Sequence, residues 1–87
     1  PYTGTYSKVL TTQGANAAGG PKSWVHGNAM TGGFGMVAWP ADYGASGIMT
    51  FMVGPDGVVL QKDLGEETGT RAAAMTAFDP DPTWTRP

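Results

Sequence analysis

Residues 48–62 read IMTFMVGPDGVVLQK, and this stretch decides the fold. Residues 48–53 are apolar on both sides except at Thr50, which is typical of a central strand with neighbours on either side. The tetrapeptide GPDG at 54–57 follows, with a proline that presets φ, an aspartate that closes a turn and a glycine for the left-handed position. Residues 58–62 then return as the paired strand. The stretch predicts an antiparallel hairpin at the centre of a β-rich domain.

Three further strands are expected upstream of this hairpin. Residues 5–12, TYSKVLTT, are rich in β-formers and alternate in polarity, and residues 34–39, FGMVAW, read as a strand that stops before Pro40, which cannot donate to a ladder. Residues 23–26, SWVH, predict a short strand at a sheet edge. The intervening segments at 13–22, 28–33 and 41–47 are rich in glycine and read as loops.

The C-terminal third predicts one helix and a tail. Residues 71–78, RAAAMTAF, favour a helix, and Glu66 and Glu67 suit the first turn of such a helix, where free N–H groups attract negative charge. Residues 79–87 hold three prolines and are expected to be extended. The sequence therefore predicts an α+β fold in one domain, residues 1–87: an antiparallel sheet of about four strands with one short C-terminal helix.

Composition limits the function. The 87 residues suffice for one domain, which buries only about 60% of its unfolded surface and is marginal without support. There is no cysteine, so disulfides and thiolate sites are excluded, and contacts with partners become the expected support. Five Lys and Arg against seven Asp and Glu argue against a nucleic-acid partner. No apolar run approaches the ~20 residues of a membrane span, and a chain that begins at Pro1 is expected to be a processed form or a fragment.

Patterns that carry catalysis are weak. The single histidine, His26, reads as a surface or packing residue, because a metal site needs several ligands. Ser46 lacks the Gly-x-Ser-x-Gly elbow of a nucleophile. The glycines of residues 32–37 precede a strand and not a helix, so they do not form a phosphate loop. We therefore expect no enzyme activity and no cofactor.

Two sets of residues are candidates for binding. Asp79 and Asp81 are weak candidates for calcium, with Asp56 and Asp63 as further donors only if the fold gathers them, since calcium takes six to eight oxygens. The aromatic residues Trp24, Trp39 and Tyr43 are candidates for binding a sugar or a protein at exposed loops. The alternative for these aromatic residues is that they form the core or a subunit interface.

Three stretches carry a family resemblance: YSKVLTTQG at 6–14, GFGMVAWPADYGASGIMTFMVGPDG at 33–57 and VVLQKDLGEETGTRAAAMTAFDPDPTW at 58–84. In this order they closely resemble the C-terminal part of a bacterial exported family, domain of unknown function 2950. The resemblance implies a location outside the cytoplasm, at the cell surface or in the periplasm. That family has no established catalytic residues, so none is carried over.

A weaker likeness concerns the order of strands and turns from residue 34 to residue 58, which is similar to the globular sheet of type IV pilin-like proteins. Pilins also have an apolar N-terminal helix, and this chain has none, so the likeness implies a helix upstream or on a companion subunit. The leading expectation is therefore a structural subunit or headpiece of a filament or envelope assembly, held by self-association or by a helical companion. The alternative is an extracellular module that binds a glycan or a protein. An enzyme domain ranks last.

Overall fold

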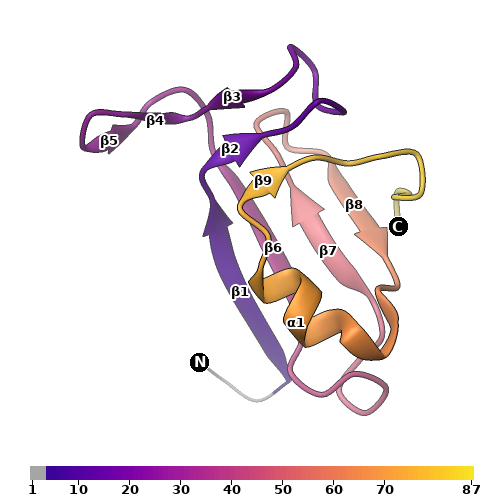
Figure 1. Ribbon diagram of the computed structural model, residues 1–87. Helices are drawn as coiled ribbons and strands as arrows, with labels where there is room; N and C mark the ends of the chain where they lie inside the picture. The colour runs from indigo at the N-terminus through magenta and orange to yellow at the C-terminus, as the bar shows by residue number, and fades with distance from the viewer. Residues whose placement is uncertain (1–3) are drawn as a thin grey trace.

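The computed structural model describes residues 4–87 and contains the expected central hairpin (Figure 1). Strands β7 (Thr50–Val53) and β8 (Val59–Lys62) pair antiparallel. The turn between them closes as its composition predicts, because the N–H of Gly57 donates to the carbonyl of Gly54 at 3.0 Å and Gly57 has a φ of 77°. The Asp56 carboxylate accepts a hydrogen bond from the next N–H, at 3.0 Å.

Four antiparallel strands form the main sheet, as predicted. Strands β1 (Thr5–Leu10) and β6 (Gly35–Pro40) join the hairpin in the order β1-β6-β7-β8. The strand with the most continuous apolar sequence, β7, therefore lies between two neighbours. The fold is α+β, with one short helix near the C-terminus.

The predicted end of this strand before Pro40 is wrong, because β6 includes Pro40. The N–H of Ala41 donates to the carbonyl of Gly4 at 2.9 Å, so Gly4 and Ala41 form a hydrogen-bonded pair. Hydrogen-bonded pairs alternate along an antiparallel ladder, and Thr5 opposite Pro40 is therefore a pair that exchanges no hydrogen bonds. On the other side β6 pairs with β7 only as far as Ala38. The strand tolerates this proline because neither neighbour needs an N–H from it.

The structure has a second, smaller layer of short strands, and the predictions of loops at 13–22 and 28–33 and of a single strand at 23–26 are wrong in part. This layer consists of a three-stranded sheet, with the order β3-β2-β9, and a projecting hairpin of β4 and β5 (Figure 1). The strands are β2 (Thr12–Gln13), β3 (Lys22–Ser23), β4 (Val25–His26), β5 (Ala29–Met30) and β9 (Ala77–Phe78).

Buried Trp24 explains why the predicted strand at 23–26 is divided. Its side chain is fully buried, and the backbone N–H of Trp24 donates to the carbonyl of Thr11 at 2.9 Å. The N–H of Thr11 in turn donates to Thr76 at 3.0 Å, which breaks the predicted strand at 5–12 into β1 and β2. These long-range hydrogen bonds have no local signal in the sequence.

The helix ends earlier than predicted, at Ala73. A 3₁₀ turn, η1 (Gly65–Glu67), leads into α1 (Thr68–Ala73), and Glu66 and Glu67 lie in this 3₁₀ turn and not in the first turn of α1. The predicted helical end at 77–78 is instead strand β9, where Phe78 pairs with Gln13 and is 6% exposed. Burial of the Phe78 ring thus overrides the helical preference of the alanine-rich segment.

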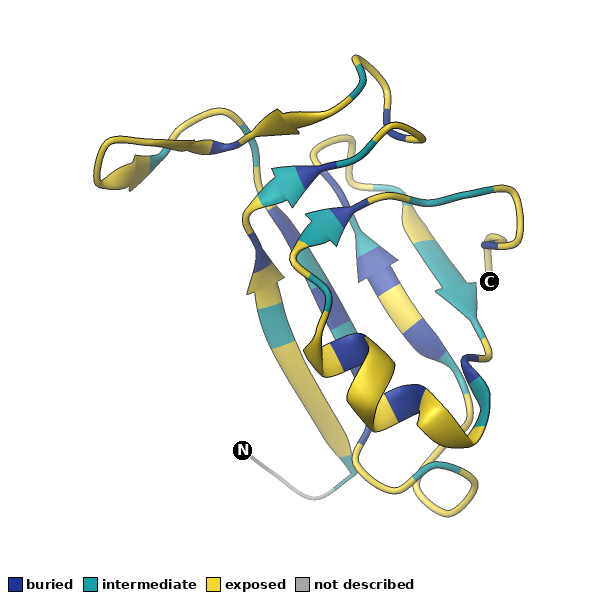
Figure 2. Cartoon of the chain, viewed as in Figure 1, coloured by how far each residue is buried: buried dark blue, intermediate teal, exposed yellow. Residues whose placement is uncertain are grey.

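The core lies between the main sheet and the segments that cross one of its faces. Helix α1 and strand β9 run over that face, and the tail passes beside β8 (Figures 1 and 2). The tail is tied down: Trp84 is 9% exposed, and Thr85 exchanges two hydrogen bonds with Gln61 of β8, at 2.7 and 3.0 Å. Within residues 4–87, no helix has the length and apolar character that crossing a membrane requires.

Candidate functional site on the open face of the sheet

The two faces of the main sheet differ in what covers them. The covered face carries Leu10, Val37 and Met52, which are at most 2% exposed, and the ammonium of Lys8 on this face donates to the carbonyl of Ala73 in α1 at 2.8 Å. Side chains alternate along a strand, so the neighbouring positions point the other way. We call that other side the open face; its strand positions are Thr5, Ser7, Val9, Met36, Ala38, Pro40, Phe51, Val53, Val59 and Gln61.

The open face is uncharged and mostly apolar. None of its ten strand positions carries a charged side chain. Val9 is 43% exposed, Phe51 39% and Val59 42%, and Ile48 and Phe34 beyond the strand ends are 48% and 53% exposed. Large exposed apolar patches are typical of interaction surfaces, which makes this face the candidate site.

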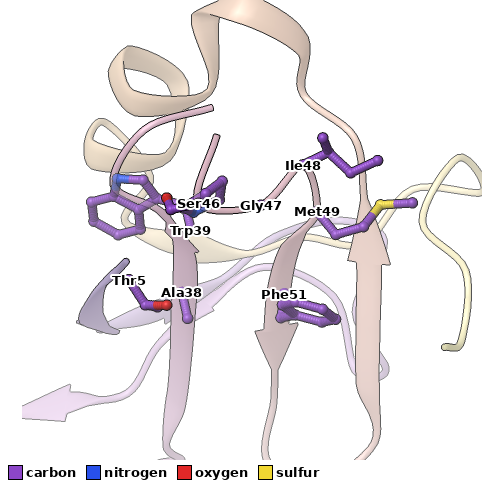
Figure 3. Close-up of a pocket in the computed structure, with 9 residues that line it drawn as sticks. Thr5, Ala38, Trp39, Ser46, Gly47, Ile48, Met49 and Phe51 are labelled. Carbon is purple, nitrogen blue, oxygen red and sulfur yellow. The ribbon is translucent and has the colours of Figure 1, made fainter. Parts of the chain in front are cut away.

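A groove lies at the end of the open face that is formed by Thr5 of β1 and the residues before β7 (Figure 3). Thr5 and Ala38 lie on one side of it, and Ile48, Met49 and Phe51 lie on the other. Its volume is about 250 Å³. A second hollow of about 150 Å³ shares Ala38 and Phe51 with the groove and extends toward Val59. The two hollows together form a corrugated apolar surface that suits side chains from another polypeptide.

Trp24, a predicted binding residue, is part of the core. Its indole N–H donates to the side-chain oxygen of Gln13 at 2.9 Å, and its ring packs on Gly35, where an added Cβ would lie 2.9 Å from the ring. Because it is fully buried, Trp24 presents no surface to a ligand.

Trp39 lies at the far end of β6 from Trp24. The two contacts with β6, at Gly35 and Trp39, are four residues apart, which is about 13 Å along a strand. Trp39 is 8% exposed, and its ring lies 6.0 Å from that of Tyr6 at an angle of 46°. The structure does not bring the predicted aromatic residues together into one binding site.

Tyr43 is tied to Asp63. Its hydroxyl donates to Asp63 Oδ1 at 2.6 Å, and the N–H of Gly65 donates to the same oxygen at 2.8 Å. These hydrogen bonds lower the pKa of Asp63, the Tyr43 bond most, and that bond also raises the pKa of Tyr43. Tyr43 also lines a hollow of about 610 Å³ together with Glu66 and Thr70.

The predicted calcium ligands accept hydrogen bonds from separate segments of the chain instead. Asp79 Oδ1 accepts hydrogen bonds from the N–H and the side-chain amide of Asn16, both at 2.9 Å. Asp81 accepts hydrogen bonds from the hydroxyl and the N–H of Thr83, which lower its pKa. Asp56 and Asp63 hold separate turns. In the described part of the chain, no group of three His, Cys, Asp or Glu side chains is placed to hold a metal ion.

His26 lies exposed on β4, in the projecting hairpin. It pairs with Ala29 across that hairpin and belongs to none of the three hollows described above.

Sequence reasoning missed the residues of the open face. The apolar character of residues 48–53 predicts a central strand but does not indicate which face is covered, and Phe51 is 39% exposed. The available signal was the absence of a second amphipathic element: with one short helix, the chain can cover only one face of a four-stranded sheet.

The comparisons with known proteins give one match. No curated protein and no solved structure matched the chain. A family model, described as a protein of unknown function (DUF2950), matches residues 1–86. The chain belongs to this family.

Proposed function

We propose that this protein is a structural subunit of a cell-envelope assembly and associates with copies of itself through the open face of its sheet. The observation that carries this proposal is the uncharged, apolar character of that face, on which Val9, Phe51 and Val59 are each about 40% exposed. Burial of apolar area contributes about 25 cal/mol per Å², so a chain that leaves this face bare gains stability when a second apolar surface covers it.

The charge of the face favours a second copy as the partner. A face without charged side chains meets its own copy without like-charge repulsion, and two sheets pack face to face about 10 Å apart with their strands nearly aligned. The size of the chain supports the same conclusion. Ten buried apolar residues form the core within residues 4–87, and the chain has no cysteine for a disulfide, so contacts between subunits would supply the support that the chain lacks.

A matched pair of valines tests this proposal. Val59 on the open face and Val25 in the projecting hairpin are both strand residues and both 42% exposed. Sedimentation velocity across a concentration series is expected to show the same association for V25K as for the unmodified chain, and smaller assemblies for V59K. Equal association of both variants would contradict the proposal, as would a monomer for the unmodified chain at millimolar concentration.

The alternative, a glycan-binding module, draws support from the hollow beside Tyr43, where an aromatic ring and the carboxylates of Asp42 and Glu66 border the same space. Under this alternative, Y43A loses binding to an oligosaccharide panel, whereas Y6A, which changes an exposed tyrosine outside the hollow, keeps it. Binding that survives Y43A would exclude this hollow as the glycan site.

We also propose that the protein functions outside the cytoplasm. This proposal rests on the resemblance of its three sequence stretches to an exported family and on an assembly role that needs no cofactor. Cell fractionation with an antibody to the chain tests it, and recovery of the protein only with cytoplasmic markers would contradict it.

A further inference from the structure

The outer edge of β1 is open, and the ladder geometry tells which of its backbone groups are free. The hydrogen-bonded pair of Gly4 and Ala41 fixes the alternation: even-numbered residues of β1 bond to β6. Thr5, Ser7 and Val9 therefore direct their N–H and C=O groups away from the sheet, and all three are exposed. At Thr11 these groups are already bonded to Thr76 and Trp24, so the free edge runs from residue 5 to residue 9.

Two features favour the addition of a strand at this edge and not at the opposite edge of the sheet. Lysine side chains often blunt exposed edges, but the ammonium of Lys8 is bonded to the Ala73 carbonyl on the covered face. The opposite edge of the sheet, at β8, is bridged by Thr85. Within residues 4–87, β1 is therefore the edge of the main sheet that no other segment pairs with.

We propose that β1 pairs antiparallel with β1 of a second copy, about a twofold axis at Ser7. This proposal rests on the self-association proposed above and names its second contact. The free edge of residues 5–9 has its midpoint at Ser7. In this register Ser7 lies opposite the partner's Ser7 and Thr5 lies opposite the partner's Val9, which forms about six hydrogen bonds, two for each hydrogen-bonded pair.

Neighbouring registers are less favourable. A shift of the axis by one residue toward Lys8 or Tyr6 leaves two hydrogen-bonded pairs within the free edge, and thus about four hydrogen bonds. The shift toward Lys8 also places Lys8 opposite the partner's Lys8, and like charges directly opposite are destabilising. With the axis at Ser7, each Lys8 lies opposite a Tyr6 ring, which is a favourable neighbour for a cation.

The open face alone is too small for a stable interface, so an edge contact is needed as well. Four strands about 4.8 Å apart and about five residues long present an open face of roughly 300 Å². A stable protein interface buries about 800 Å² on each partner, so one open face alone gives weak association. In the twofold pairing, odd-numbered residues of β1 lie opposite odd-numbered residues of the partner's β1, so their side chains point to the same side of the combined sheet. The two open faces therefore join into one eight-stranded surface of roughly 600 Å².

Single cysteines test the register cleanly, because the chain contains none of its own. Residues in a hydrogen-bonded antiparallel pair have Cα atoms about 5.5 Å apart, which is within the range that a disulfide spans. Under a mild oxidant, S7C is expected to form a covalent dimer. T5C and V9C alone are expected to stay monomeric, because each lies about 13 Å from its own copy along the strand, whereas a mixture of T5C and V9C forms the heterodimer.

The outcomes separate the two proposals. No S7C dimer, or dimers of S7C, T5C and V9C in equal yield, would overturn the edge pairing. If the unmodified chain still associates and V59K abolishes that association, the open-face assembly stands without the edge contact. If neither association nor cross-linking occurs, both proposals fail. S7P gives an independent check: it removes an outward N–H, so it should keep the fold by circular dichroism and lose the edge contact, whereas an unchanged tendency to associate through the edge contradicts the pairing.

Discussion

The indole N–H of Trp24 donates to the side-chain oxygen of Gln13 at 2.9 Å, inside the junction between the main sheet and the smaller one. The amide nitrogen of the same glutamine donates to the carbonyls of Ala18 and Gly20, at 2.7 and 2.8 Å. Gln13 is 5% exposed. One buried side chain therefore holds both the tryptophan of the core and the loop that connects β2 with β3.

Replacement of Gln13 by leucine is expected to lower the free energy of unfolding by about 1–3 kcal/mol, because it leaves the buried indole N–H without an acceptor. Urea denaturation measures the change. The control is Q61L, a half-buried glutamine whose side chain has no hydrogen bond to residues 4–87, where the change should stay within about 0.5 kcal/mol. Equal effects of the two variants would refute the role of Gln13.

Replacement of Thr50 by valine is expected to leave stability unchanged or raise it. Thr50 is fully buried, and its hydroxyl has no hydrogen-bond partner among the described residues. The polar group therefore costs desolvation without a compensating bond, and valine has nearly the same shape. Thermal unfolding measures this, and a loss of more than about 1 kcal/mol would show that the hydroxyl has a partner.

The hydrogen bond between Asp63 and Tyr43 is expected to make the free energy of unfolding depend on pH in the acid range. The folded-state pKa of Asp63 lies below its ordinary value of 3.8, so its contribution is fully present above that pH and is lost as the pH falls through the lower folded-state value. D63N is therefore expected to flatten the fall of stability below about pH 4, and Y43F to flatten it in part. Denaturation midpoints at pH 7 and pH 3 measure the difference. An unchanged slope in D63N would contradict this assignment.

Replacement of Gly54 by alanine is expected to destabilise the fold by about 1–3 kcal/mol, since an added Cβ would lie 2.5 Å from the buried ring of Phe78. The matched control is G69A. Gly69 lies in α1 with open space around it, and alanine there should be neutral or stabilising by about 1 kcal/mol. Chemical denaturation of both variants tests the contrast, which would fail if G54A were as stable as the unmodified chain.

The main sheet was predictable from the sequence because its signals are local. The hairpin at 48–62 carries its own turn residues, and the strand containing Val37 carries the apolar residues that the interior of a sheet needs. The position of α1 was predictable only in part. Residues 77–78 follow a helix-favouring, alanine-rich segment, but burial of the Phe78 ring against Gly54 outweighs one more helical turn.

The smaller layer and the open face depend on contacts between distant residues. Nothing near Thr11 indicates that its N–H bonds to Thr76, and nothing near Trp24 distinguishes a core tryptophan from an exposed one. The outward orientation of Phe51 follows from the shortage of covering elements in the whole chain, and not from its neighbours in sequence.

The most direct test of the open face as an interface is a dilution series followed by methyl NMR. The methyl groups of Val9, Val53 and Val59 on that face are expected to shift as concentration rises, whereas those of Val25 in the projecting hairpin and Val37 in the core keep their positions. Shifts that are absent up to millimolar concentration, or that appear at Val25 and not on the open face, would contradict the account.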